Sequence, residues 1–309
     1  MPVTRTALAA TLCLYLGLTG TALSQTTDTA EPRRHPGEIL DLSSMQTLSP
    51  DDLYLKLARK KVILIGEQHD NPEHHAVETL LLEELVTPGT RVVFEMLESD
   101  LALDELGIST SKGELKAALE PVTPGWDWAT YGRLYRNVLQ LGGHLVGGNL
   151  NQAQIKAIYQ GQTDALPERE QKTRSGVATT VREHIANEIS AQHCEPVPAK
   201  RLESMVEIQL ARDARMAAQL DQHATNKTAV LVAGGYHVRK DLGVPRHLER
   251  DDISVILLAP VGDDGEVVGG DELVSNQVAD YLWFTSAIGE KDYCGDTAID
   301  ASQATPSSN

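Results

Sequence analysis

Short apolar segments alternate with helical patterns through the middle of the chain. Six segments rich in aliphatic and β-branched residues predict strands, at residues 61–65, 91–94, 144–147, 229–233, 253–259 and 281–285. They are apolar throughout rather than alternately apolar and polar, which is typical of parallel strands covered on both faces. The pattern therefore predicts a single α/β domain over residues 38–295, with a mainly parallel sheet between helices.

Helices are predicted between these strands. Asp70 or Asn71 can cap a helix that has Pro72 in its first turn. Another helix begins near Trp126 and carries aromatic residues at helical spacing, and a longer one covers about residues 198–222. Most of the few aromatic residues of the chain are therefore expected on one helix face.

The apolar stripe of the long helix is interrupted by Gln209, Arg212 and Asp213. Such residues on a core-facing stripe either ligate a bound group or form a structural ion pair. We favour an Arg212–Asp213 pair that positions its neighbours.

The first 24 residues have the features of a secretory signal peptide. Arg5 is the only charged residue before Asp28, an apolar segment follows it, and Ala22-Leu23-Ser24 supplies small residues for cleavage. We expect the mature chain to begin at Gln25 and to be periplasmic or secreted.

The cysteines bear on the same compartment. Lipid anchoring is not expected, because bulky Leu12 precedes Cys13 at a position where a lipobox requires a small residue. Cys194 and Cys294 remain after cleavage, and an oxidising compartment would allow them to pair. Sequence alone does not show whether they meet, so both states stay open.

The ends and the charge of the chain exclude some roles. Residues 25–37 are polar and predict a flexible lead-in, and residues 296–309 predict a disordered tail. Asp and Glu number 44 against 27 Lys and Arg, which gives a formal net charge of −17. A general nucleic-acid binder needs a basic face, so we expect no nucleic-acid partner.

Candidate chemistry first appears in the segment GEQHDNP at residues 66–72. Gly66, Glu67 and His69 lie here between a predicted strand and a predicted helix. Ligand sites of open α/β sheets lie beyond the carboxyl ends of the strands, where a Glu and a His can ligate a metal or act as an acid–base pair. A hydrophilic capping turn is the alternative, and a cap does not require all three residues.

A second turn of the same G-x-x-H form follows the strand at 229–233. It contains Gly234, Gly235, Tyr236 and His237. Glycines allow the backbone to approach a ligand closely. Two such turns on one parallel sheet are expected to face a common cleft, although a solvated loop is the alternative.

Other charged residues are also candidates for the site. Glu95 extends an apolar strand, where a carboxylate is costly unless it is paired, metal-bound or at a hydrated strand end. Arg239, Lys240 and Arg246 form the densest basic patch of this acidic chain and suit an anionic ligand group. The sequence contains no CxxC, Walker A, GxSxG or HExxH motif.

Taken in order along residues 62–285, these motifs resemble those of the ChaN-like haem-binding uptake proteins, part of the TIKI/TraB-type superfamily. The matching segments are GEQHDNPEHH at 66–75, VVFEML at 92–97, WDWATY at 126–131, GGNL at 147–150, HC at 193–194, QLARDARMA at 209–217, GGYHVRKDLGVPRHL at 234–248 and DYLWFT at 280–285.

The resemblance implies an exported protein that binds haem for haem and iron uptake or sequestration. It also implies a homodimer and a partner among outer- or inner-membrane haem transport components. Haem needs an axial ligand, an apolar slot and cations for its propionates. Tyr236 is the first candidate for the iron ligand because it adjoins His237, and Tyr131 and Tyr135 are the fallbacks. The full expected haem set is Tyr236, His237, Arg239, Arg246 and Tyr131.

The wider superfamily implies an alternative function. A divalent metal would activate water for a peptidase or esterase reaction. Its expected ligands are Glu67, His69, Glu95 and His237. A third interpretation is a binding module whose site has decayed, against which the intact GEQH and GGYH turns count.

Overall fold

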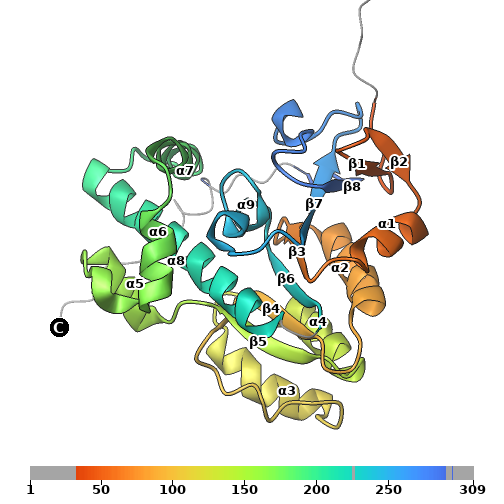
Figure 1. The fold of residues 1–309 in the computed structure, drawn as a ribbon, viewed down its shortest axis with the longest axis horizontal. Helices are drawn as coiled ribbons and strands as arrows, with labels where there is room; N and C mark the ends of the chain where they lie inside the picture. The colour runs from red at the N-terminus through yellow and green to blue at the C-terminus, as the bar shows by residue number, and fades with distance from the viewer. Residues whose placement is uncertain (1–32, 225–226, 290–293, 295–309) are drawn as a thin grey trace, which may run out of the picture. The chain divides into compact units, whose positions relative to one another are not determined.

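The computed structural model describes residues 33–224, 227–289 and 294 (Figure 1). The predicted signal peptide, residues 25–32 of the lead-in and the tail at 296–309 lie outside the described residues. Within the lead-in, the Gly37 amide donates to the Phe284 carbonyl at 2.8 Å. No helix among the described residues is long and apolar enough to cross a membrane.

One sheet of eight strands lies at the centre, in the order β2-β1-β8-β7-β3-β6-β4-β5. All six predicted strands are confirmed, and each pairs in parallel with its neighbours among the six. Their bounds are β3 Val62–Glu67, β4 Arg91–Glu98, β5 His144–Asn149, β6 Ala229–Gly234, β7 Ile253–Val261 and β8 Tyr281–Ser286.

Two strands were not predicted. β1 (Ile39–Asp41) and β2 (Gln46–Leu48) form an antiparallel pair that joins the β8 edge of the sheet. Each has three residues, which is too short for a pattern of alternation to be recognised.

Helices cover both faces of the sheet, as predicted (Figure 1). On β3, Ile63 and Ile65 pack in one core with the helices after β2, β3 and β4. Val62 and Leu64 pack in a second core on the opposite face, beneath the long helix α8. The helices are α1 Pro50–Leu57, α2 Pro72–Leu85, α3 Lys112–Leu119, α4 Trp128–Gln140, α5 Gln152–Tyr159, α6 Glu168–Ser175, α7 Thr179–Ala191, α8 Ala199–His223 and α9 Gly235–Val238.

Burial on both faces explains why the strand segments are mostly apolar instead of alternating between apolar and polar residues. Each buried Val, Leu or Ile side chain contributes about 1.5–3 kcal/mol through removal from water. A polar residue inside these strands would face a core on one side or the other. The sequence pattern and the layered architecture therefore have the same cause.

α5, α6 and α7 pack on the outer side of α8 and have small apolar clusters of their own. A disulfide joins Cys194, just beyond α7, to Cys294, with 5.6 Å between the Cα atoms. The structure thus has the paired state that the sequence left open. The bond closes a segment of 100 residues that includes α8, β6 and β7.

Candidate functional site

The first G-x-x-H turn joins β3 to α2. Asn71 caps α2, because its side chain accepts a hydrogen bond from the Glu73 amide at 3.0 Å, and Pro72 occupies the first turn. Of the two predicted caps, the structure therefore selects Asn71. The strand end and the cap fix the turn at both sides and leave Glu67 and His69 beside the carboxyl edge of the sheet.

Glycines bring the two turns together. A Cβ atom on Gly66 would lie 2.2 Å from Val238 Cγ2 and 3.1 Å from the Gly235 Cα. A Cβ atom on Gly234 would lie 2.9 Å from His69 Nε2. Only glycine permits this approach, so the repeated glycines of the two motifs have a steric reason.

Glu67 is buried at the end of β3 and is held by three side chains. Its Oε1 lies 2.9 Å from His69 Nδ1 and accepts a hydrogen bond from the Tyr131 hydroxyl at 2.8 Å, and its Oε2 lies 3.0 Å from His75 Nδ1. Burial alone would raise the pKa of Glu67, but the adjoining imidazoles of His69 and His75 hold it at about 2. Glu67 is therefore a carboxylate.

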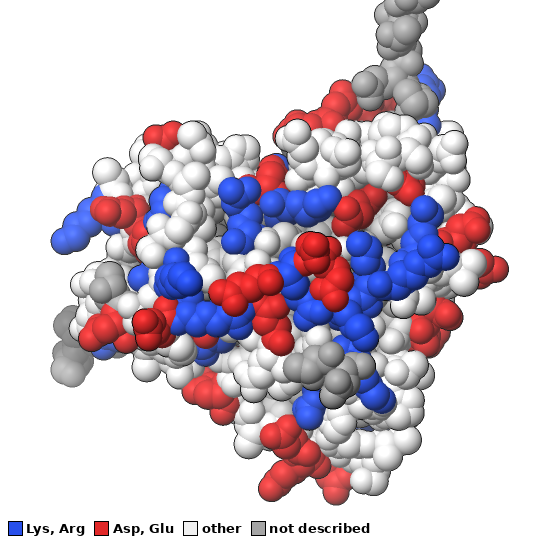
Figure 2. Space-filling model, viewed as in Figure 1, with Lys and Arg blue, Asp and Glu red and all other residues white. Residues whose placement is uncertain are grey.

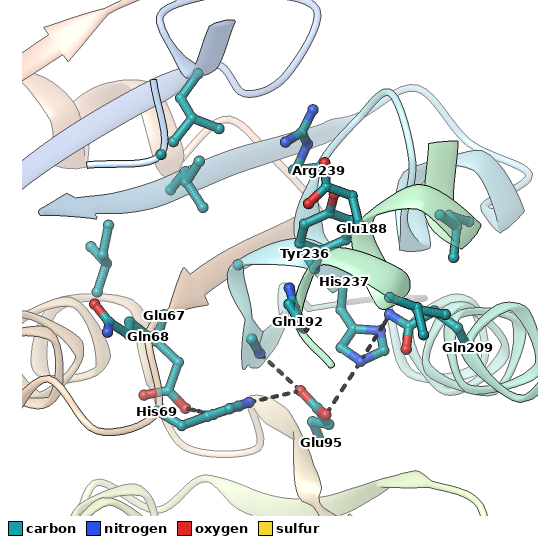
Figure 3. Close-up of a pocket in the computed structure, with 18 of the residues that line it drawn as sticks. Glu67, Gln68, His69, Glu95, Glu188, Gln192, Gln209, Tyr236, His237 and Arg239 are labelled. Atoms are coloured by element: carbon teal, nitrogen blue, oxygen red, sulfur yellow. Dashed lines mark hydrogen bonds and ion pairs between the residues drawn. The ribbon is translucent and has the colours of Figure 1, made fainter. Parts of the chain in front are cut away.

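Glu95 and His237 form the other half of the floor (Figure 3). Glu95 Oε2 accepts a hydrogen bond from the Gly234 amide at 2.8 Å, and Oε1 lies 3.3 Å from His237 Nε2. His237 Nδ1 lies 2.5 Å from Asp213 Oδ1. Burial opposes the charge of His237, but the Glu95 and Asp213 carboxylates raise its pKa to about 10. His237 is thus an imidazolium ion held between two carboxylates.

His69 connects the two halves. Its Nε2 lies 3.9 Å from Glu95 Oε2, and its side chain is 38% exposed. Burial opposes its charge, while Glu67 and Glu95 raise its pKa. The result is a line of alternating carboxylates and imidazoles in which His69 is the member most open to solvent. The members, in order, are Glu67, His69, Glu95, His237 and Asp213.

A cavity of about 750 Å³ lies above this line. This volume is within the range of small-molecule sites, and the position beyond the carboxyl ends of parallel strands is where such sites form in open α/β sheets. The apolar part of the wall comes from α7, β7 and the loop before β8. We call this cavity the cleft; its apolar residues are Ile185, Ile189, Leu257, Leu258 and Leu273.

Tyr236 lines the cleft beside Arg239 and Glu188 (Figure 3). Its hydroxyl oxygen is buried and makes no well-formed hydrogen bond with any described residue. Burial, together with the neighbouring Glu188 carboxylate, raises the pKa of the phenol above its usual value. The Arg239 guanidinium lies 5.4 Å from the centre of the Tyr236 ring and makes two hydrogen bonds to Asp241, at 3.0 and 2.7 Å.

The other residues predicted for haem lie elsewhere. Tyr131 is buried beneath the floor, where it contacts Glu67 and His69. Arg246 is exposed and donates to the Asp241 carbonyl at 3.3 Å, outside the residues described as lining the cleft. Lys240 is paired with Asp280 at 2.7 Å.

The expected Arg212–Asp213 pair was wrong. No such pair occurs among the described residues, and Asp213 binds His237 instead. Adjacent residues on a helix point about 100° apart, so they rarely face each other. Gln209 also approaches His237, with its Nε2 3.3 Å from His237 Nδ1.

The four predicted metal ligands lie along the floor, but no three of them form the group of ligand atoms that meets within 4.8 Å. In the described part of the chain, that group is Glu67, His75 and Glu78, with ligand atoms all within 4.8 Å of one another. His75 and Glu78 were not singled out from the sequence. Their spacing of three residues on one predicted helix was the available signal.

The structure is an α/β protein with a cavity at the carboxyl edge of a parallel sheet. The family model described as haem-binding uptake, Tiki superfamily, ChaN matches residues 53–248. The chain belongs to this family, which confirms the resemblance seen in the sequence. No protein of curated function matches the chain.

Solved structures include a relative from the same family. The structure titled "Cofacial heme binding to ChaN of Campylobacter jejuni" superposes with a TM-score of 0.64 and 26% identity, over 79% of this chain and 95% of that one. A mutant of the erythromycin esterase EreC in its open conformation matches with a TM-score of 0.41 and 15% identity, over 88% of this chain and 87% of that one. The type III effector HopBA1 matches with a TM-score of 0.38 and 13% identity, over 77% of this chain and 93% of that one.

Proposed function

We propose that this protein is an exported haem-binding protein that acts in haem and iron uptake or sequestration. Haem would occupy the cleft, with Tyr236 as its iron ligand. Membership of the haem-binding ChaN family supports the ligand, and the relative from Campylobacter jejuni is described as binding haem cofacially. A homodimer and delivery to a membrane haem transporter are part of the same proposal.

The Tyr236 hydroxyl is the observation that carries the choice of site. The hydroxyl is buried beside the Glu188 carboxylate, which can only accept a hydrogen bond, so the lone pairs of its oxygen have no donor among the described residues until a ligand binds. Tyrosine is an established axial ligand of haem iron, and the apolar side chains of the cleft suit the face of a porphyrin. His237 is a poorer candidate, because Glu95 and Asp213 engage both of its nitrogens.

Arg239 is the cation best placed to assist. Its contact with the Tyr236 ring would favour the phenolate over the phenol when iron is bound. Its bidentate pairing with Asp241 leaves less of the guanidinium for a propionate. We therefore assign Arg239 chiefly to the iron ligand, and the exposed Arg246 to the periphery.

A haemin titration tests the site. Chelator-treated mature protein is titrated with haemin and followed in the Soret region. We expect saturable binding, weakened at least about tenfold by Tyr236→Phe, with loss of the tyrosinate-to-iron charge-transfer band. Tyr131→Phe, which removes a hydroxyl beneath the floor, should keep that band. A band lost in Tyr131→Phe and kept in Tyr236→Phe would assign the iron to the other tyrosine.

Export is supported by the amino-terminal sequence and by the disulfide. Disulfides persist in oxidising compartments and are rare in the cytosol of most organisms. Fractionation of expressing cells, with mass spectrometry of the mature amino terminus, tests this part. We expect cleavage before Gln25 and a soluble product outside the cytoplasm.

A second function is favoured by the line of charged residues on the floor. Glu67, His69, Glu95 and His237 follow one another in a line of contacts on the floor, which supports the metallohydrolase hypothesis, although no three of them form the group of ligand atoms that meets within 4.8 Å. A bound divalent metal would lower the pKa of a water molecule and so generate a nucleophile.

Elemental analysis and a screen of ester and peptide substrates separate the two functions. The hydrolase requires bound metal and turnover that are both lost in His69→Ala. Full activity of metal-free protein would exclude this mechanism. Haem binding with no turnover on any substrate would leave the first function standing.

A further inference from the structure

A cluster of three ionisable side chains lies beneath the cleft, between β3 and the first turns of α2. Glu67 ends the strand, and His75 and Glu78 lie three residues apart on the buried side of the helix. Their ligand atoms are all within 4.8 Å of one another. We propose that Glu67, His75 and Glu78 form a binding site for one divalent transition-metal ion.

The carboxylate oxygens of this cluster are incompletely satisfied. His75 Nδ1 lies 3.0 Å from an oxygen of Glu78 and 3.0 Å from an oxygen of Glu67, but one N–H can point at only one of them. The hydrogen bond goes to Glu78 Oε2. Glu67 Oε2 and Glu78 Oε1 are buried and make no hydrogen bond with any described residue. A cation between the three side chains would satisfy both oxygens.

The ring of His75 is oriented as in metal-binding histidines. Its Nε2 lies 3.0 Å from the His69 carbonyl oxygen, which can only accept a hydrogen bond. Nε2 therefore carries a hydrogen. Burial opposes a charge on His75, but the Glu67 and Glu78 carboxylates raise its pKa to about 10, so Nδ1 also carries a hydrogen in the metal-free chain. A bound ion would displace the Nδ1 hydrogen and take the lone pair of that nitrogen. Histidine ligands of metals typically donate their other nitrogen to a carbonyl or carboxylate in this way.

Glu67 also has an orienting partner. The Tyr131 hydroxyl donates to its Oε1 at 2.8 Å, so one oxygen is held by the protein and the other faces the cluster. Outer hydrogen bonds of this kind fix ligand carboxylates in metal sites. This contact gives the buried Tyr131 a role that does not require it to reach the cleft.

His75 also lines a second cavity, which is separate from the cleft. This cavity of about 300 Å³ lies between α2 and α4. The side chain of His75 is 14% exposed, while those of Glu67 and Glu78 are fully buried. His75 therefore lies between this second cavity and the two buried carboxylates.

The donor set indicates the class of ion. One imidazole nitrogen and carboxylate oxygens, with no sulfur, suit Mn²⁺, Fe²⁺ or Zn²⁺ better than Cu⁺. Three protein ligands leave at least one position for water. The site shares only Glu67 with the ligand set expected from the superfamily, and it does not depend on the proposed haem function.

Mn²⁺ binding tests the proposal. Chelator-treated mature protein is titrated with Mn²⁺, and the free ion is followed by electron paramagnetic resonance. We expect one ion per chain and about 100-fold weaker binding in both His75→Ala and Glu78→Gln. Glu83→Gln, on the exposed side of the same helix, removes the same charge and should bind as the wild type does. His237→Ala should also leave binding unchanged.

Other outcomes would overturn the site. One is the absence of stoichiometric binding of both Mn²⁺ and Zn²⁺. Another is Mn²⁺ binding that Glu78→Gln leaves intact and His237→Ala abolishes. If a variant fails to fold, anomalous scattering from Mn²⁺-soaked crystals of the wild type decides. Density in contact with Glu67, His75 and Glu78 supports the proposal, and density only in the cleft refutes it. Haemin binding is measured in a separate titration, so failure of the metal site and failure of the haem site can be distinguished.

Discussion

The imidazolium of His237 makes stability depend on pH. Burial opposes its charge, but Glu95 and Asp213 raise its pKa from 6.5 to about 10 in the folded chain. The folded state therefore holds a proton that the unfolded chain loses above pH 6.5. We predict that the free energy of unfolding decreases as pH rises from 6.5 to 10, by up to about 1.4 kcal/mol per pH unit.

Urea unfolding of chelator-treated protein at several pH values in this range measures the slope. His237→Gln should make the slope smaller, because one titrating imidazole is gone. His75, whose pKa the Glu67 and Glu78 carboxylates raise to about 10 against the effect of burial, should maintain the remaining slope. His184→Gln on the exposed surface of α7 is the matched control and should keep the wild-type slope. A wild-type stability that does not change across the range would contradict the assigned charge.

The residues of the floor differ in how far the sequence could reveal them. Glu67, His69, Glu95 and His237 were placed together because each follows a predicted strand, and parallel strands end at one edge. Asp213 was found as a polar interruption of a helix, but its partner was misassigned. Pairing across elements depends on helix rotation and crossing, which a pattern of apolar positions does not determine.

At the scale of the elements, α7 and the disulfide control one wall of the cleft. α7 contributes Ile185, Glu188 and Ile189 to the lining, and Cys194 follows its last turn. We predict that replacing both cysteines by serine lowers the free energy of unfolding by about 2–4 kcal/mol. Haemin binding should weaken several-fold, because a less restrained α7 must be ordered when the ligand binds.

Denaturant unfolding and haemin titration measure the two effects. Treating the wild type with a thiol reductant should reproduce both, and the same reductant should leave the double-serine variant unchanged. Equal haemin affinity of the wild type and the double-serine variant would show that packing on α8 alone holds α7 in place.

The strands that the sequence predicts and the two strands that it does not predict differ in their source of stability. The six long strands are buried on both faces, so the apolar residues in their own sequences are enough to predict them. β1 and β2 are short edge strands whose pairing depends on β8, more than 200 residues away in sequence. Local sequence contains no information about such a partner, so the hairpin was absent from the prediction.

At the scale of the whole molecule, charge is the property that bears on ligand capture. The formal net charge is −17, and acidic and basic side chains are interspersed on the face shown in Figure 2. The cleft itself contains five acidic residues and one arginine: Glu67, Asp70, Glu95, Glu188, Glu272 and Arg239. Haemin carries two anionic propionates, so long-range electrostatics oppose its approach.

We therefore predict that haemin associates faster as salt is added. The Debye length falls from about 30 Å at 0.01 M ionic strength to about 8 Å at 0.15 M, which screens the repulsion of the whole chain but not contacts within the cleft. Stopped-flow Soret measurements should show a rise of several-fold over this range, with little change in the dissociation rate. Arg246→Gln, which removes an exposed positive charge near the cleft, should slow association mainly at low salt. A rate that falls with salt would instead show that the local cations dominate the field, and would return Lys240 and Arg246 to the capture of propionates.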